Sequence, residues 1–448
     1  PLPRRAPQPR PRTPRATEAR LRAVKSMDTI FALSSGAPPA GIAVVRVSGP
    51  ASASALEQLA GRIPPARRAT AMILRGADGG ELDRALVLWL PGPGTATGED
   101  TAELHLHGGR AVVASIEAEL AHIPGLRRAE AGEFTRRAFA NGRIDLAEAE
   151  GLADLLAAET ESQRRAALLM AGGALSRQVE AWRGEVLALS AAVEAILDFG
   201  DEDDVDALPD DFGARLAVLA GDIAAWLEKP TAERLRDGIR VVLGGPPNAG
   251  KSSLFNALIG SDAAIVTATP GTTRDVIERP VAVSGMPFIL VDTAGVRGEG
   301  ADHIEALGIA RAEAEFQRAD IVLWLGPEGK GPAGAFEVSA KSDLEGTMKS
   351  AADAVVSAAT GEGVGELWTA IADRGRSLLP IPGEVALHDR QREALRDAFD
   401  ELSASSASVP LLLAERLRRA RVALDGITGR ASTEDMLDTL FGRFCIGK

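Results

Sequence analysis

The sequence has no tyrosine and only one cysteine, Cys445, among its 448 residues. A single cysteine excludes an intramolecular disulfide and any zinc site built from several cysteines, and it favours a reducing, cytoplasmic location. Long apolar runs are missing too. The longest uncharged stretch, residues 29–45, is interrupted by the segment Gly-Ala-Pro-Pro-Ala-Gly and is too short to span a bilayer, so we expect no membrane partner.

The sequence also has fewer basic than acidic residues. The chain has 50 Lys and Arg against 63 Asp and Glu, a net charge of −13, which argues against a protein that coats nucleic acid through a general basic surface. Residues 1–26 nevertheless hold seven Arg and six Pro. Dense proline prevents the amphipathic helix of an organelle transit peptide. We interpret residues 1–26 as a disordered extension or a misassigned start, with Met27 as the true beginning.

Changes in residue patterning predict a multidomain protein of α/β and all-helical regions. Residues 27–143 mix short β-like runs, Gly/Pro turns and one helical stretch, which predicts an α+β domain. Helical spacing then dominates, interrupted by the strand, glycine loop and helix pattern of a doubly wound sheet. We expect this sheet to be inserted within the helical domain. The helical domain would then comprise residues 144–234 and 376–448, on either side of a P-loop domain at residues 235–375.

A glycine-rich loop is the strongest single motif. Residues 245–252 read Gly-Pro-Pro-Asn-Ala-Gly-Lys-Ser, which fits G-x4-G-K-S and lies where a predicted strand turns into a predicted helix. In such a loop the backbone N–H groups surround phosphate oxygens, Lys251 reaches the outer phosphates and Ser252 offers a hydroxyl to Mg²⁺. The loop residues expected at the nucleotide are Asn248, Ala249, Gly250, Lys251, Ser252 and Ser253.

Three later segments, in this order after the glycine-rich loop, favour GTP over ATP. Asp292, Thr293, Ala294 and Gly295 follow an apolar run, where a carboxylate holds Mg²⁺ through water and a glycine N–H senses the terminal phosphate. Further on, Lys341 with Asp343, and Ser357 with Ala358, occupy the places of base-reading loops. The carboxylate of Asp343 accepts two hydrogen bonds from guanine that adenine cannot donate. Ala340 stands where an asparagine is usual, so this loop alone is a weak match, and Lys341–Asp343 by itself also fits a surface ion pair.

Taken together, these motifs and several others resemble the tRNA-modifying GTPase family MnmE, also called TrmE. The resemblance covers about 420 residues from Met27 onward. It implies a homodimer, an N-terminal domain (27–143) that dimerises and binds 5-formyl-tetrahydrofolate, and a GTPase domain of the Ras type. It also implies an MnmG-like FAD protein that forms a heterotetramer with the homodimer. Together the two proteins would use a folate one-carbon unit to place an aminomethyl or carboxymethylaminomethyl group on carbon 5 of the wobble uridine (U34) of certain tRNAs. The marks are Asp28-Thr-Ile30, Val45-Arg-Val-Ser-Gly49, Thr97-Gly-Glu-Asp100, Gly132-Glu-Phe-Thr135, Arg137-Ala-Phe139, Gly271-Thr-Thr-Arg-Asp275 and Phe444-Cys-Ile-Gly-Lys448.

For the GTPase domain, the resemblance implies two cations and one carboxylate that orients the attacking water. Mg²⁺ is implied at Ser252 and Thr273, and the carboxylate is implied at Glu305. K⁺ would supply the positive charge that an arginine finger supplies elsewhere, and would depend on two GTPase domains facing each other. A solvated acid in the first turn of a helix is the plain alternative for Glu305. The implied K⁺ ligands are Asn248, Thr267, Thr269 and Thr272.

The resemblance also implies a folate site. Its residues would be Arg46, Glu103, Arg143 and Lys448, with paired cations for a glutamate tail and a carboxylate for the pterin N–H groups. Arg143 stands where the family often has lysine, and any one of these residues also fits an ordinary surface ion pair. Cys445 would lie near this site as a group that assists the chemistry, or simply as a small tail anchor. His105 and His107 lack further ligands, so we expect no transition metal.

Two other functions fit some of these features. A GTP-switched ribosome-assembly factor shares the GTPase core, but such proteins usually append a basic RNA-binding domain, whereas the chain after residue 26 has a net charge of −20. A P-loop kinase or ATPase is disfavoured by Asp343 and by the Thr272-Thr273 pair. We therefore expect a K⁺-stimulated GTPase that acts in tRNA modification.

Overall fold

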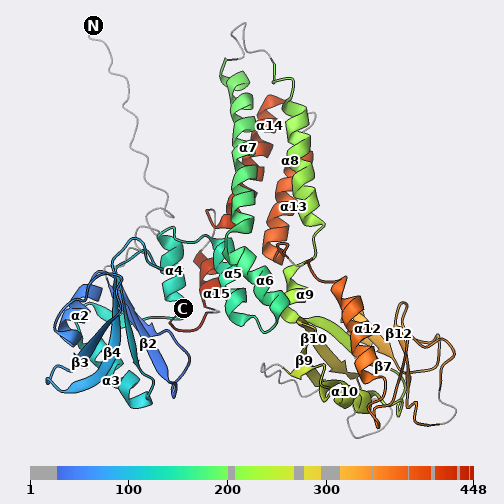
Figure 1. The fold of residues 1–448 in the computed structure, drawn as a ribbon. Coiled ribbons are helices and arrows are strands. Elements are labelled where there is room, and N and C mark those ends of the chain that lie inside the picture. Colours follow the sequence, from blue (N-terminus) through green and yellow to red (C-terminus); the bar gives the residue numbers. More distant parts are fainter. Residues whose placement is uncertain are drawn as a thin grey trace, which may run out of the picture. The chain divides into compact units, whose positions relative to one another are not determined.

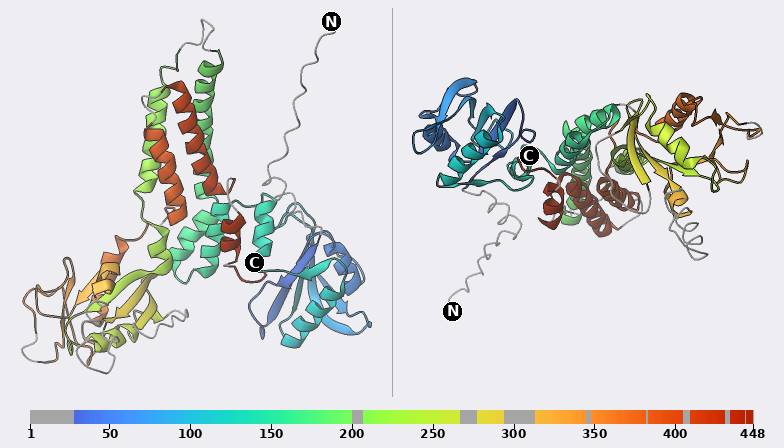
Figure 2. Two further views of the ribbon diagram at one scale, coloured as in Figure 1. Left: turned by 180° about the vertical axis from the view of Figure 1, so that it is seen from behind. Right: turned by 90° about the horizontal axis from the view of Figure 1, so that it is seen from below.

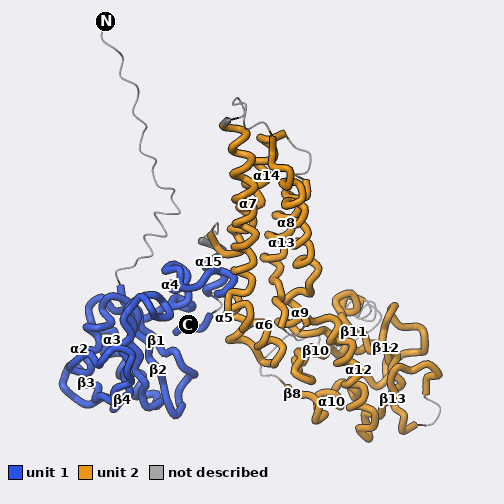
Figure 3. The backbone as a smooth tube through the Cα atoms, turned by 45° about the horizontal axis from the view of Figure 1, so that its top comes forward, with its two compact units in different colours: residues 1–149, 432–448 blue, residues 150–431 orange. Residues whose placement is uncertain are grey.

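The structure is a computed structural model that describes residues 28–199, 207–266, 277–293, 313–344, 348–381, 383–404, 409–430, 434–442 and 444–447. It divides into two compact units (Figure 3), residues 1–149 with 432–448 and residues 150–431. No helix within the described ranges is long and apolar enough to cross a membrane.

Unit 1 is built on a six-stranded sheet with the order β3-β4-β5-β2-β1-β6 (Figure 1). Helices α2 and α3 contribute to a core against one face, where buried residues alternate with partly exposed ones along β2 and β5. The elements are β1 Thr29–Leu33, β2 Ile42–Ser48, α2 Ser52–Ala60, β3 Thr70–Arg75, β4 Glu81–Leu90, β5 Thr101–His107, α3 Arg110–His122, β6 Leu126–Arg128, α4 Glu133–Ala140 and α15 Glu434–Phe441.

The C-terminal tail packs on the N-terminal region of unit 1. Ile446 forms an antiparallel bridge with Ala131, and the hydroxyl of Ser34 donates a 2.8 Å hydrogen bond to the carbonyl of Gly447. Gly447 has φ +95°, and an added Cβ would lie 2.0 Å from the carbonyl oxygen of Leu33. The tail therefore needs glycine at this position both for its backbone conformation and for its close approach to β1.

Four helices of unit 2, α7, α8, α13 and α14, form an antiparallel bundle (Figures 1 and 2). Helix α14 packs on α7 and α13, and α13 packs on α8. Val179, Trp182, Val186, Leu189 and Val193 recur on α7 at helical spacing and are buried, which is why this stretch forms a packed helix. The helices are α5 Leu146–Ala157, which contains the division between the units, α6 Glu161–Ala171, α7 Ala174–Phe199, α8 Phe212–Leu227, α13 Asp389–Ser403 and α14 Pro410–Thr428.

The second sheet of the chain has seven strands in the order β13-β12-β11-β7-β10-β9-β8. The first five in this order are mutually parallel, and β9 pairs antiparallel with both of its neighbours, β10 and β8. Val241, Val242 and Leu243 are all fully buried, as expected of a strand covered on both faces. The elements are α9 Ala232–Asp237, β7 Ile239–Gly244, α10 Lys251–Ile259, β8 Ile265–Val266, β9 Ile277–Val283, β10 Met286–Asp292, β11 Ile321–Trp324, β12 Phe336–Ala340, β13 Ala354–Val356 and α12 Val364–Arg376.

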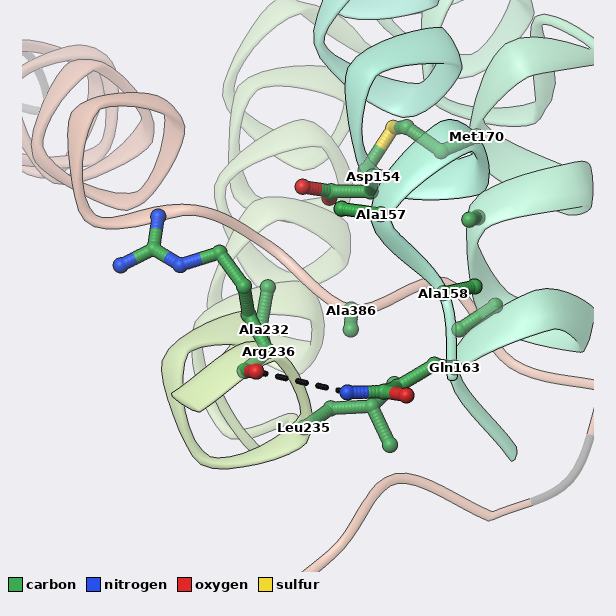
Figure 4. A pocket seen from close by; sticks show the side chains of 11 residues that line it. Asp154, Ala157, Ala158, Gln163, Met170, Ala232, Leu235, Arg236 and Ala386 are labelled. Carbon is green, nitrogen blue, oxygen red and sulfur yellow. Dashed lines mark hydrogen bonds between the residues drawn. The ribbon is translucent and has the colours of Figure 1, made fainter. Parts of the chain in front are cut away.

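The chain enters and leaves this sheet domain side by side, as expected of an inserted domain. Thr231 and Leu387 form a parallel bridge, and the N–H of Ala232 donates a 2.9 Å hydrogen bond to the carbonyl of Leu387. A cavity of about 60 Å³, lined largely by alanine, lies beside this junction, where Gln163 bonds the carbonyl of Arg236 (Figure 4). Its volume suits a few water molecules rather than a nucleotide. The predicted fold class, an α+β domain, a helical domain and an inserted doubly wound sheet, is confirmed.

Candidate functional site

The glycine-rich loop connects the end of β7 to the start of α10. Gly245, Asn248 and Gly250 have positive φ angles of 143°, 62° and 100°, which turn the chain sharply between strand and helix. Lys251 is 8% exposed, and its Nζ lies 2.7 Å from the carbonyl of Gly245 and 3.0 Å from that of Pro246. The ammonium group is therefore held inside the loop, where N–H groups at a helix N-terminus and a cation together favour a phosphate.

Asp292 stands beside this loop at the end of β10. It is 1% exposed and faces Leu243 of β7 in the parallel register, two residues before Gly245. The hydroxyl of Thr293 donates a 2.8 Å hydrogen bond to the carbonyl of Leu243. The ends of β7 and β10 thus bring a buried carboxylate and the phosphate loop to one edge of the sheet, where ligands bind in open α/β sheets.

The predicted base-reading loops meet at the ends of β12 and β13. The hydroxyl of Ser357, which is fully buried, donates a 2.7 Å hydrogen bond to Oδ1 of Asp343. Ala358 follows Ser357 and is half-buried. Nζ of Lys341 lies 2.7 Å from the carbonyl of Asn248 in the phosphate loop. Lys341 is therefore not a simple surface ion-pair partner, because it joins the base loop to the phosphate loop.

The structure places these predicted nucleotide residues together at the carboxyl edge of the second sheet. Ser252 and Ser253 are exposed in the first turn of α10, and Ala249 packs partly against the core. Thr267, Thr269, Thr272, Thr273, Ala294, Gly295 and Glu305 lie outside the described residues, as does Lys448. The cation-binding roles of Thr267, Thr269, Thr272 and Thr273 therefore stay predictions, as does the water-orienting role of Glu305.

The predicted folate residues lie in unit 1. Arg46 and Glu103 face each other on β2 and β5, with Nη2 of Arg46 3.0 Å from Oε1 of Glu103 and both side chains partly exposed. Nε2 of His105 lies 3.4 Å from the other oxygen of Glu103. Arg143 is exposed, and its aliphatic portion lies beside Gly98. The pair on β2 and β5 thus places a partly exposed cation and a partly exposed carboxylate side by side.

The tail contacts the end of β1, the strand that pairs with β2. Arg46 faces Ala32 in the register of β1 and β2, and the neighbouring Leu33 contacts Gly447. The guanidinium of Arg46 also lies over the ring of Phe134, 5.7 Å from its centre. Cys445 is exposed in the same tail. The described part of the tail, residues 444–447, therefore lies against β1, one strand away from Arg46.

An ionic cluster around Arg137 was missed by reasoning from spacing. The Arg137 side chain is only 4% exposed, and its guanidinium contacts Asp28 at 3.0 Å, Glu133 at 3.1 Å and Glu99 at 3.3 Å. Burial alone would raise the pKa of Glu133, but hydrogen bonds from Arg127, the Glu130 backbone and Arg137 outweigh it and lower the pKa. Four of the family marks meet in this cluster, so those motifs were the signal that could have identified it.

Comparisons with known proteins agree with this arrangement. The model of the family "GTP-binding protein TrmE N-terminus" matches residues 29–143, and that of the "MnmE helical domain" matches residues 146–445. The chain is 61% identical over 424 residues to a protein of Erythrobacter litoralis named "tRNA modification GTPase MnmE", covering 94% of this chain and 100% of the relative. A relative of the same name in Zymomonas mobilis is 51% identical, with 94% and 100% coverage.

Solved structures of other GTPases are much more distant. The G domain of the T. maritima FeoB iron transporter is 24% identical, covers 31% of this chain and 98% of its own, and gives a TM-score of 0.23. Era of Aquifex aeolicus, bound to GDP and aluminium fluoride, is 21% identical, covers 38% of this chain and 69% of its own, and also gives 0.23. These low scores carry no inference about the function of this chain.

Proposed function

Because the chain belongs to the MnmE family of tRNA modification GTPases, we propose that it hydrolyses GTP to GDP and that this reaction serves modification of carbon 5 of the wobble uridine in tRNA. The observation that carries the proposal is the joint placement of Lys251, Asp292 and Asp343 at one sheet edge, in a chain whose other unit belongs to the TrmE type. GTP hydrolysis alone does not require unit 1, the unit of the TrmE type. A role in modification does.

Metal ions would complete the GTPase site. Ser252 begins α10 and buried Asp292 ends β10, so both oxygen-bearing side chains come from the carboxyl edge of the sheet; Mg²⁺, which prefers oxygen ligands, would be held by Ser252, with Thr273 as a further ligand. K⁺ would take oxygen ligands from Asn248, Thr267, Thr269 and Thr272 and supply charge to the transition state. Glu305 would orient the attacking water.

The proposal expects K⁺ to accelerate hydrolysis several-fold over Na⁺, because a pocket of amide and carbonyl oxygens discriminates between cations by size. Steady-state GTP hydrolysis measured in KCl and in NaCl at matched ionic strength checks this. Asn248→Ala should abolish the difference between the salts. Equal rates of the unaltered protein in both salts would remove K⁺ from the mechanism.

The one-carbon unit would enter through unit 1. Arg46, Glu103, Arg143 and Lys448 would hold a 5-formyl-tetrahydrofolate, and a flavoprotein similar to MnmG would join a homodimer of this chain in a heterotetramer. The sheet face opposite α2 and α3 supports the dimer, because Ile42, Ile73 and Leu86 on that face are 63%, 37% and 42% exposed in the described chain. The cytoplasm is the compartment that fits a single free cysteine.

Cys445 would act in the modification step rather than in GTP hydrolysis. Cys445→Ser should lower the fraction of modified wobble uridine in tRNA while leaving the GTPase rate unchanged, since the tail packs on unit 1 and the nucleotide loop belongs to unit 2. Nucleoside analysis of tRNA from complemented strains measures the first quantity. Wild-type modification in the Ser variant would leave the residue as a tail anchor only.

The whole proposal is tested by tRNA from a strain that lacks the protein. Its wobble uridines should lose their substituent at carbon 5, and expression of the full chain should restore it. The second candidate, a ribosome-assembly GTPase, expects the ribosome profile to change and the wobble uridines to stay as in the parent strain. That outcome would reject the role in tRNA modification and leave GTP hydrolysis standing.

A further inference from the structure

A lysine with a largely buried side chain, outside every nucleotide motif, contacts β11 and β12 next to the base-reading loop. The Lys349 side chain is 9% exposed, and its Nζ lies 2.5 Å from Oε2 of Glu337 and 2.7 Å from the carbonyl of Trp324. Lysine is rarely buried unless its ammonium is paired, because desolvating the charge costs free energy. The ammonium of Lys349 thus links the end of β11 to β12, because it bonds a carbonyl of the first strand and a carboxylate of the second.

The same residue also holds the strand from which the base loop begins. The N–H of Lys349 donates a 3.1 Å hydrogen bond to the hydroxyl of Ser339, which is 1% exposed and directly precedes Ala340. Oε1 of Glu337 accepts a 3.0 Å hydrogen bond from the N–H of Gly329. Lys349 therefore contacts β12 at two points just before the strand reaches Ala340. Its side chain bonds Glu337, and its backbone N–H bonds Ser339.

Ala340 lies next to the phosphate loop but offers it only a methyl group. A Cβ added to Gly250 would come within 4.0 Å of the Ala340 Cβ and 3.4 Å of Cε of Lys341. A polar side chain at position 340 would thus reach the phosphate loop and bond its backbone. Alanine has no such group, so position 340 cannot supply this bond between the two loops.

We propose that Lys349 is a positioning residue for guanine binding, which fixes the end of β12 from behind and so keeps Asp343 in place without a polar side chain at position 340. This rests on the proposed GTP binding of the site. Asp343 is three residues from Ala340 and is held at its other side by Ser357. If β12 shifted, Asp343 would lose the alignment with the two guanine donors on which the choice of GTP over ATP depends.

The test is a double-mutant cycle between Lys349→Met and Ala340→Asn in the full chain. Calorimetric titration with GTP and with ATP gives the affinities. Lys349→Met should weaken GTP binding by about fivefold or more and reduce the GTP-to-ATP affinity ratio. In the Ala340→Asn background the same change should cost about twofold or less, because the asparagine ties the loop directly. Lys349→Arg, which keeps the charge, should restore most of the binding.

Lys330→Met serves as the control, because Lys330 is an exposed lysine close in sequence to Glu328 and Gly329. This substitution should leave the affinities for GTP and for ATP unchanged. If Lys349→Met loses its thermal unfolding transition, Glu337→Gln removes the same ion pair at nearly constant shape and enters the cycle in its place. If Lys349→Met weakens GTP binding equally in the unaltered and the Ala340→Asn chains, or weakens it in neither, the positioning role is overturned. Failure of the unaltered protein to bind GTP would instead reject the proposed function itself.

Discussion

Replacing Arg137 by methionine should lower the free energy of unfolding of the N-terminal unit by about 3–5 kcal/mol. The guanidinium is 4% exposed and contacts three carboxylates, those of Asp28, Glu99 and Glu133. Methionine fills some of the volume but leaves these negative charges close together with less compensation. Hydrogen exchange of the full chain, followed by mass spectrometry on peptides from residues 28–149, measures the loss of protection in that unit.

The neighbouring Arg136→Met is the matched control. Arg136 forms a 2.8 Å pair with Asp438, but the two side chains are 31% and 59% exposed, so solvent screens the interaction. Surface pairs of this kind contribute about 0–1 kcal/mol. Equal loss of protection in the two variants would show that the buried cluster has no special weight in the stability of the unit.

The same cluster predicts a pH dependence. Burial opposes ionisation of Asp28, but hydrogen bonds and charge from Arg127 and Arg137 outweigh it and lower its pKa, as they do for Glu133. A carboxylate with a lowered pKa in the folded state stabilises the fold above its ordinary pKa, and this stabilisation is lost as the pH falls through the lowered value. The N-terminal unit should therefore lose protection on acidification, and Arg137→Met should show a smaller change.

The sequence predicted the features of the site that are local in the chain. The phosphate loop is one continuous segment between a buried apolar strand and a helix, so its residues and their chemistry were visible together. The apolar runs that became β7, β10 and β11 were visible for the same reason, since strands covered on both faces have no polar alternation.

Contacts between distant segments could not be read from spacing. Arg137 meets Asp28 across 109 residues, and Ser34 meets Gly447 across 413. Neither pair belongs to a periodic pattern, so only a resemblance to relatives marked these segments as related. Lys349 had no signal at all, because a lysine in a polar loop is usually a solvated side chain and its burial depends on how β11 and β12 pack.

Replacing Lys251 by alanine should lower the rate of GTP hydrolysis by about 10²- to 10³-fold. The ammonium is held by the carbonyls of Gly245 and Pro246, which places it within the loop that surrounds the phosphates. Charge on the transferred phosphoryl oxygens grows toward the transition state, and a pre-placed cation stabilises it without reorganisation. Single-turnover hydrolysis at saturating GTP measures this chemical step separately from nucleotide affinity.

The consequence for tRNA separates two models of how the units cooperate. Lys251 belongs to unit 2 and contacts the phosphate loop, so its loss should leave hydrogen-exchange protection of residues 28–149 unchanged. If hydrolysis drives modification, a strain that carries Lys251→Ala should have wobble uridines as poorly modified as the deletion strain, although unit 1 is intact. Normal modification together with the slowed GTPase would mean that nucleotide binding suffices and that hydrolysis only resets the protein.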